Sequence, residues 1–242
     1  NALGTINDVR RVVEIAHGVG ALAYIDAVQY APHGPIDVQA LDADFLACSA
    51  YKFFGPHVGI VYGKHEHLAG LPAYKVRPAT DDVPGRWETG TQNHEGLAGV
   101  AAAVDYLAWV GEQFGAPAEG RREALKAGLR AIKAYEQTLS RALIEGLEAI
   151  PGVTARGITE LDALADRVPT VIFNVESQHP AEVAARLGER GIYVWDGNYY
   201  ALSVMEHMGL EETGGMVRVG PVHYNTLDEI DRFLEAVREV AG

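Results

Sequence analysis

Three short apolar runs, at residues 21–25, 44–49 and 59–62, most constrain the fold of this chain. A helical pattern at residues 8–17 precedes the first run and ends at Gly18 and Gly20, which are helix stop signals. Short, nearly continuous apolar runs that alternate with helices are typical of buried parallel strands in α/β structures. The first half of the chain therefore predicts a mostly parallel sheet in an α/β fold.

The rest of the chain predicts a long loop, two helices and a smaller domain. Residues 70–92 are rich in proline, glycine and charge, and helical patterns follow at residues 93–110 and 120–150. Beyond residue 152, strands are predicted at 170–175, 192–195 and 216–222, and helices at 181–190 and 227–240. The last helix is predicted to be capped by Asn225 or Thr226. We expect a partial large domain over residues 1–118, and a bridging helix with a small α+β domain over residues 119–242.

Composition excludes several classes of protein. With 48% hydrophobic and 22% charged residues, the 242-residue chain has the composition of an ordinary globular protein. A formal net charge of −13 argues against nucleic acid or an anionic membrane as the main partner. No apolar run approaches the roughly 20 residues of a membrane span. The single cysteine, Cys48, cannot form an internal disulfide, so cytoplasm is the expected compartment.

Asp26 and Lys52 each end a predicted strand, where ligands bind in open α/β sheets. Taken singly, Asp26 is more simply explained as a strand-end cap and Lys52 as a surface lysine. As a pair they suit a cofactor with a basic ring nitrogen and an aldehyde, because the carboxylate keeps the ring protonated and the amine attacks the carbonyl. We expect neighbouring aromatic residues to desolvate Lys52 partly and so make its amine nucleophilic.

Other polar residues have both a structural and a functional interpretation. Ser49 and Tyr51 offer hydroxyl donors that suit a phosphate ester, or they are ordinary strand-end groups. Arg218 lies within an apolar strand pattern and offers a planar fork for a carboxylate, or it is a partly exposed strand residue. The aromatic loop at residues 195–200 either lines a substrate pocket or joins two domains.

Five motifs in this order resemble the class-V aminotransferase and cysteine desulfurase-like family of pyridoxal-phosphate (PLP) enzymes. Residues 1–6 read NALGTI, residues 23–29 read AYIDAVQ, residues 49–56 read SAYKFFGP and residues 87–91 read WETGT. The fifth motif combines Arg218 with YNT at residues 224–226. The resemblance covers the whole chain and implies a PLP-dependent transferase-like large domain.

The resemblance also implies roles in binding the cofactor. Lys52 forms the Schiff base with pyridoxal 5'-phosphate, and Asp26 pairs with the pyridine nitrogen. Gln29 is expected to hydrogen-bond the phenolic oxygen of the ring. Ser49 and Tyr51 are expected to hold the phosphate, with Tyr51 in place of the family's histidine. This replacement keeps a donor but removes a potential positive charge.

Two further sets of residues concern the partner subunit and the substrate. Thr91 is implied to reach the phosphate of a neighbouring subunit, so the resemblance implies a homodimer. Arg218 is implied to bind the substrate α-carboxylate, and Asn198 and Tyr200 are expected to contact the substrate. The implied function is an enzyme of the aminotransferase, lyase or epimerase type that acts on an amino acid or amine. The sequence does not distinguish among these reactions or identify the substrate.

The sequence departs from cysteine desulfurases at the catalytic cysteine. The matching stretch, GNYYA at residues 197–201, places Tyr200 near the cysteine position, and a phenol cannot accept a sulfur atom. We therefore expect no desulfurase activity, and a desulfurase that uses Cys48 is the weaker alternative. No counterpart of the family's N-terminal part is found, so we expect the sequence to be a piece of a longer chain. The remaining alternative is a non-catalytic fragment that serves as a dimerising or structural module.

Overall fold

The computed structural model describes residues 1–242, which divide into two compact units. The N-terminal unit is Asp8–Ala131, and the C-terminal unit combines Asn1–Asn7 with Ile132–Gly242. The division therefore falls inside helix α5 (Arg121–Glu148), whereas the sequence placed it near residue 118. The first residues belong to the C-terminal unit because Thr5 forms an antiparallel bridge with Arg167.

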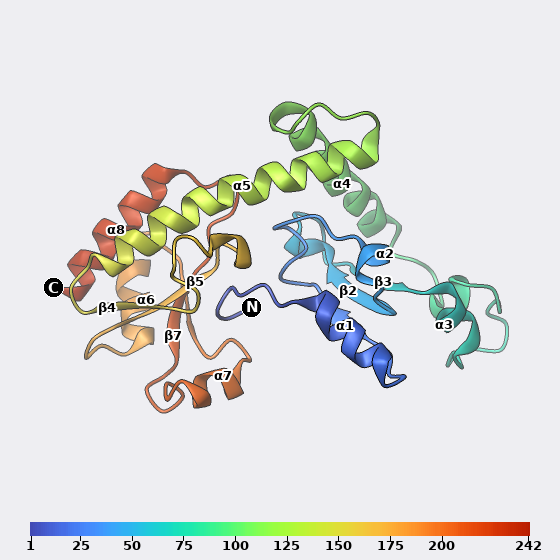
Figure 1. The fold of residues 1–242 in the computed structure, drawn as a ribbon, viewed down its shortest axis with the longest axis horizontal. Helices are drawn as coiled ribbons and strands as arrows, with labels where there is room; N and C mark the ends of the chain where they lie inside the picture. Colours follow the sequence, from blue (N-terminus) through green and yellow to red (C-terminus); the bar gives the residue numbers. More distant parts are fainter. The chain divides into compact units, whose positions relative to one another are not determined.

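The N-terminal unit contains a three-stranded mixed sheet (Figure 1). Its strands are β1 (Tyr24–Asp26), β2 (Phe45–Ser49) and β3 (Gly59–Gly63), in the order β1-β2-β3. The predicted runs thus form strands, and β1 and β2 are parallel as expected. The prediction of a mostly parallel sheet is wrong for β3, which is antiparallel to β2. The chain between β2 and β3 is too short for the crossover connection that parallel neighbours require.

The outer strands of this sheet are more exposed than the apolar runs predicted. Tyr24 and Asp26 of β1 are exposed, as are Ile60 and Val61 of β3, whereas Leu46 of the central strand is buried. The reason is position, because β1 and β3 are edge strands with one neighbour each.

The two predicted helices that lie wholly within the N-terminal unit begin at side-chain caps. Asp8 caps α1 (Val9–Gly18) by accepting a hydrogen bond from the Arg11 backbone at 3.0 Å. Asn93 caps α4 (His94–Phe114) in the same way, and both predicted helices are confirmed. The structure adds two short helices that the sequence pattern did not predict, α2 (Val38–Leu41) and α3 (His65–Gly70).

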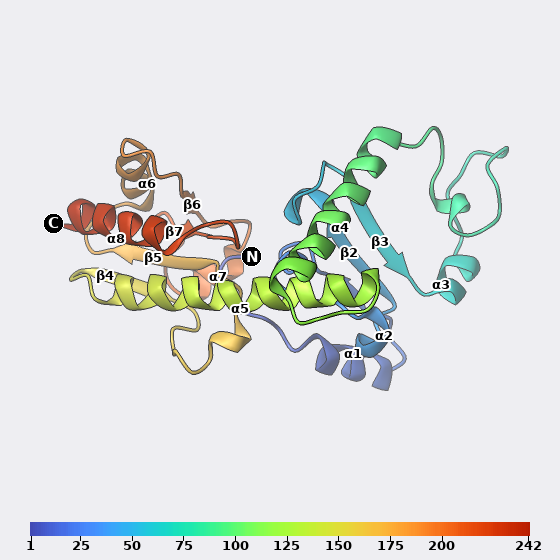
Figure 2. The same cartoon turned by 90° about the horizontal axis from the view of Figure 1, so that it is seen from above.

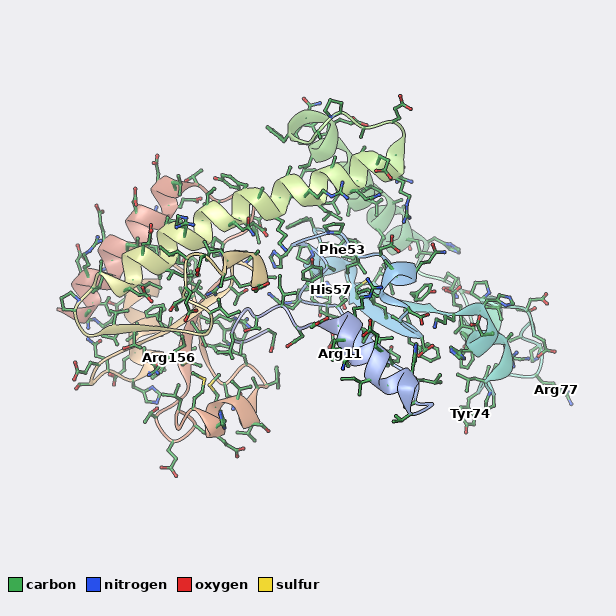
Figure 3. All side chains as sticks on the ribbon, viewed as in Figure 1. Arg11, Phe53, His57, Tyr74, Arg77 and Arg156 are labelled. Atoms are coloured by element: carbon green, nitrogen blue, oxygen red, sulfur yellow. The ribbon has the colours of Figure 1, made fainter.

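The predicted loop between α3 and α4 is present and contains one 3-10 turn at Gly85–Trp87. The Trp87 indole donates to the carbonyl of Leu68 at 2.9 Å, which ties this turn to the end of α3. Figure 3 labels Tyr74 and Arg77 on the same loop, where Tyr74 is fully exposed.

The C-terminal unit contains a four-stranded antiparallel sheet, in agreement with the predicted α+β architecture. Its strands are β4 (Val153–Arg156), β5 (Val171–Val175), β6 (Trp195–Gly197) and β7 (Met216–Val219), in the order β4-β5-β7-β6. The sequence pattern missed β4, and it placed the strand that contains Trp195 too early, at residues 192–195.

Alternation along β5 gives the C-terminal sheet two covered faces. Phe173 points toward α5, α6 (Pro180–Gly188) and α8 (Leu227–Ala241), which form the main core. Figures 1 and 2 show α8 alongside the C-terminal half of α5. Ile172 points to the opposite face, where it packs with Tyr199 and with Met205 of the short helix α7 (Leu202–His207). None of the helices is both long and apolar enough to cross a membrane.

Candidate active site

Asp26 and Ser49 lie on one face of the N-terminal sheet, at the carboxyl ends of its two parallel strands. Asp26 ends β1 and is in register with Ala47 of β2, and Ser49 ends β2 two residues further on. Side chains two residues apart on a strand share a face, and so do residues in register on adjacent strands. The two side chains therefore project from the same side of the sheet, at the edge where ligands bind in α/β folds.

The Asp26 carboxylate keeps one oxygen available. Its Oδ1 accepts a hydrogen bond from the Val28 backbone at 2.9 Å, which fixes the turn after β1, and Oδ2 has no partner. The structural and the functional interpretation of Asp26 are thus compatible, because Oδ1 fixes the turn and Oδ2 is available to a ligand. Gln29 follows in the same turn and is half-buried.

Lys52 ends a 3-10 turn at Ala50–Lys52 that directly follows β2. Its side chain is exposed, so the partial desolvation expected from its aromatic neighbours is wrong for this unit. The turn explains the difference, because it buries Ala50 and Phe53 and turns Tyr51 and Lys52 outward. The amine makes no hydrogen bond or ion pair, and it lies 5.6 Å from the centroid of the Tyr51 ring. An unpaired amine is free to react with a carbonyl.

Backbone hydrogen bonds fix the turn that carries Lys52. Ala50 donates to the carbonyl of Val58 at 2.8 Å, and Gly55 donates to the carbonyl of Ala50 at 2.8 Å. The Tyr51 ring stacks on His57, with centroids 4.8 Å apart. Figure 3 labels Phe53 and His57 on this turn.

The hydroxyl groups of Ser49 and Thr91 have no hydrogen-bond partner in the structure. Ser49 adjoins the 3-10 turn that carries Lys52, whereas exposed Thr91 lies shortly before α4. No hydrogen bond joins Thr91 to the other predicted cofactor residues. The N-terminal unit therefore gathers Asp26, Ser49 and Lys52 at the ends of β1 and β2, and leaves Thr91 free for another partner.

Cys48 occupies the opposite face of β2 from Ser49, because it is the adjacent residue on the strand. It is in register with Ile60 of β3, and burial raises the pKa of its thiol. A raised pKa reduces the thiolate fraction, which is the nucleophilic form. The single thiol thus projects away from the face that carries Asp26.

In the C-terminal unit, Arg218 lies on the inner strand β7, between β5 and β6. Its guanidinium carbon is 4.6 Å from the centroid of the Tyr199 ring, and Nη1 donates to the carbonyl of Asn1 at 3.0 Å. It forms no ion pair with a carboxylate, and burial lowers its pKa. Most of the guanidinium donors are therefore available for an anionic ligand.

Asn198 and Tyr200 belong to the loop after β6. The Asn198 amide donates to Glu211 at 3.3 Å, and its oxygen accepts from the Tyr200 backbone at 3.2 Å. Tyr200 is fully exposed and has a φ of 61°, a left-handed conformation that is costly for a non-glycine residue. Tyr199, which the sequence analysis did not select, shares this conformation with a φ of 55°. No local pattern separates the two tyrosines, because only packing shows that Tyr199 is buried.

Comparisons with known proteins agree on one family. The sequence profile described as Aminotransferase class-V matches residues 1–233. A cysteine desulfurase of Pectobacterium atrosepticum is 30% identical over 253 residues, covering 99% of this chain and 56% of the relative. A probable cysteine desulfurase of Methanothermobacter thermautotrophicus is 31% identical over 256 residues, covering 100% of this chain and 58% of the relative.

Solved structures give the same result. The apo structure of a cysteine desulfurase from Thermococcus onnurineus NA1 has a TM-score of 0.83 and 31% identity, and the match covers 100% of this chain and 57% of that one. The cysteine desulfurase CsdA from Escherichia coli has a TM-score of 0.79 and 26% identity, with 98% and 56% covered. The chain thus spans a little over half the length of the relatives it matches.

Proposed function

The chain belongs to the class-V aminotransferase family, and we propose that it provides the lysine and the ring-binding carboxylate of a PLP-dependent enzyme that acts on an amino acid or amine. The family match and the similar structures confirm the expected α/β fold class. The enzymes of this family depend on pyridoxal phosphate, so the expected cofactor is confirmed for the family.

The observation that carries the proposal is the unpaired amine of Lys52 beside the carboxyl ends of β1 and β2. A lysine that binds PLP covalently needs an amine that is not held in an ion pair. The four other lysines, Lys64, Lys75, Lys126 and Lys133, each form an ion pair or a hydrogen bond in the structure. Lys52 is therefore the lysine that fits this role.

The surrounding residues fit the parts of the cofactor. The free Oδ2 of Asp26 would hold a protonated ring nitrogen, while Oδ1 keeps its hydrogen bond from the Val28 backbone. The hydroxyl of Ser49 is free to donate to the phosphate, and Tyr51 offers a second hydroxyl. Pyridoxal phosphate, when bound, supplies an electron sink that stabilises negative charge at the substrate Cα.

Two residues act on the substrate in this proposal. Arg218 binds the α-carboxylate through its available guanidinium donors. The Lys52 amine, which forms no hydrogen bond or ion pair in the structure, would move the substrate α-proton as a general base.

We further propose that the reaction is not sulfur transfer. The relatives that match are named cysteine desulfurases, but the motif resemblance places Tyr200 near the position of the catalytic cysteine that sulfur transfer requires. The remaining thiol, Cys48, lies on the sheet face opposite Asp26 and Ser49, and its raised pKa disfavours the thiolate. Transamination, elimination or epimerisation remain, because none of them requires a protein thiol. Sulfide released from L-cysteine at a catalytic rate would contradict this part of the proposal.

A homodimer is proposed because Thr91 has a free, exposed hydroxyl and is not joined to Ser49 or Lys52. In a dimer, Thr91 binds the cofactor phosphate of the neighbouring subunit. Light scattering after size-exclusion chromatography tests this directly. A monomer that binds PLP with full affinity, and with the same affinity after Thr91→Ala, would refute the proposed role of Thr91.

Borohydride labelling tests the function. The chain is mixed with PLP, the visible absorbance of lysine-bound PLP is recorded, and borohydride then fixes the cofactor to its lysine for peptide mapping. We expect the label on Lys52, no label in Lys52→Ala, and unchanged labelling in the matched control Lys126→Ala. A label on another lysine, or no visible absorbance at saturating PLP, would contradict the proposal.

A further inference from the structure

The Tyr199 ring forms the surface on which the Arg218 guanidinium rests. The guanidinium carbon lies 4.6 Å from the ring centroid, within the range of a cation–π contact. Tyr199 is 5% exposed, so the contact is largely shielded from water, and such contacts are stronger than those at exposed sites. The ring therefore restrains a charged group that has no carboxylate partner.

The hydroxyl, the carbonyl and the ring of Tyr199 all hold this residue in place. Its hydroxyl donates to the carbonyl groups of Trp195, at 3.1 Å, and Met216. Its own carbonyl accepts a hydrogen bond from the Asn1 amide at 2.8 Å. Its ring packs in the small core on the face of the sheet that also carries Met205. Tyr199 thus links β6, β7 and the first residue of the chain.

The contact with the Tyr199 ring leaves most donors of Arg218 free. A ring contacts the flat face of a guanidinium, whereas the N–H groups point outward from its edge. One edge donor is bound to the carbonyl of Asn1, and the others have no protein partner. An arginine side chain is otherwise long and flexible, so fixing its plane lowers the entropy lost when it binds a planar anion.

The backbone of Tyr199 supports a special role. Its φ of 55° lies in the left-handed region, where a tyrosine is disfavoured and glycine is not. This conformation places the Tyr199 ring in the core while exposed Tyr200 follows it. Strain of this kind persists where the surrounding structure fixes a residue for a purpose.

We propose that Tyr199 is a positioning residue, which holds the Arg218 guanidinium in the orientation that binds the carboxylate of the substrate. The inference rests on the proposed role of Arg218 and extends it to a residue that does not itself contact the substrate. The ring face carries the effect, and the hydroxyl serves to anchor the ring.

Two variants separate the ring from the hydroxyl. Tyr199→Phe keeps the aromatic face and loses the hydrogen bonds to the carbonyls of Trp195 and Met216. Tyr199→Met also loses them but replaces the ring with a flexible apolar chain that suits a core containing Met205 and Met216. Any difference between the two variants therefore reports on the aromatic face.

Acetate is the probe, because it is a carboxylate without an amine and does not require a loaded cofactor. The Nε–Hε signal of Arg218 is followed by NMR during the titration, and it is assigned by its loss in Arg218→Lys. We expect Tyr199→Phe to bind acetate within about threefold of the unaltered chain. Tyr199→Met should bind about tenfold more weakly, as expected for the loss of a shielded cation–π contact. Its Hε signal should also move downfield, because the shielding by the ring is lost.

The outcomes separate this inference from the proposed function. Equal acetate affinity in Tyr199→Met and the unaltered chain refutes the positioning role, as does a tenfold loss in Tyr199→Phe. If circular dichroism shows that Tyr199→Met does not fold, Tyr199→Leu, which also lacks the ring, takes its place and is compared with Tyr199→Phe by the same limits. Borohydride labelling of Lys52 without any acetate binding refutes the inference and the proposed role of Arg218, and leaves the proposed PLP site at Lys52 intact. Acetate binding without labelling of Lys52 refutes the proposed PLP site and leaves the inference about Tyr199 intact.

Discussion

Asp44 is a buried carboxylate that connects several elements of the N-terminal unit. It lies just before β2, its side chain is 3% exposed, and its carboxylate accepts four hydrogen bonds. The backbone of Ala23 donates at 2.7 Å and His17 at 2.8 Å, while Lys64 and His67 each donate at 3.0 Å. The carboxylate therefore joins the end of α1, the start of β1, the end of β3 and α3 to the strand that leads to the site.

Asp44→Asn should lower the free energy of unfolding of the N-terminal unit by about 3 kcal/mol at neutral pH. An amide oxygen can keep the bond from Ala23, but the amide NH₂ faces donors and cannot accept. About two charge-assisted hydrogen bonds are then lost, each with a net contribution of about 1.5–3 kcal/mol. We take the lower half of that range because Lys64 and the two histidines are partly exposed and regain water.

The stability lost in Asp44→Asn should decrease as the pH falls. Burial by itself raises the pKa of Asp44, but the hydrogen bonds from Ala23, His17, Lys64 and His67 outweigh it and hold the pKa well below its usual range. A carboxyl group whose pKa is lower in the folded state stabilises the fold above its unfolded pKa of about 4 and loses this contribution as the pH falls. The stability difference between the unaltered chain and Asp44→Asn should thus be full at about pH 5 and shrink below about pH 4.

Urea unfolding monitored by tryptophan emission measures this difference. Trp87 and Trp109 lie in the N-terminal unit, and Trp195→Phe removes the signal of the other unit. The matched control is Asp81→Asn, which removes an ion pair with Lys75 at 2.9 Å whose carboxylate is 88% exposed, and it should change stability little. The reasoning is refuted if both variants lose the same stability, or if the loss in Asp44→Asn persists unchanged at about pH 3.

Three further substitutions test the packing, the strained loop and the last helix. A Cβ at Gly128 would overlap the Leu107 carbonyl, so Gly128→Ala should lower the free energy of unfolding by about 1–3 kcal/mol, measured by urea unfolding. The control Gly18→Ala should not lower it, because the space around Gly18 is open. Tyr200→Gly should raise stability by about 1 kcal/mol, because the residue is fully exposed with a φ of 61°; a loss of stability would show that the strain argument is wrong. Thr226→Ala removes the capping box of α8 and should lower the thermal midpoint, with a loss of about 1 kcal/mol; an unchanged midpoint would contradict this.

Local signals in the sequence were enough to place most helices. The cap at Thr226 and the helix that follows it depend on contacts within one turn, so they were predictable without knowledge of the fold. The same holds for α4, which begins at His94 directly after its cap Asn93, within one residue of the predicted start. The sequence pattern does not indicate β4, because an alternation of only four residues is too short to identify a strand, and the strand depends on pairing with β5.

The order of short motifs in the sequence determined the family and the choice of Lys52 and Asp26, since these depend on residue identity along the chain. Only the tertiary structure decided that Asp26 shares a face with Ser49 and that Cys48 lies on the opposite face, because strand register sets which side chains point together. It also decided that Lys52 is exposed and that Arg218 rests on Tyr199. Burial and stacking arise between segments far apart in the chain, and no local pattern encodes them.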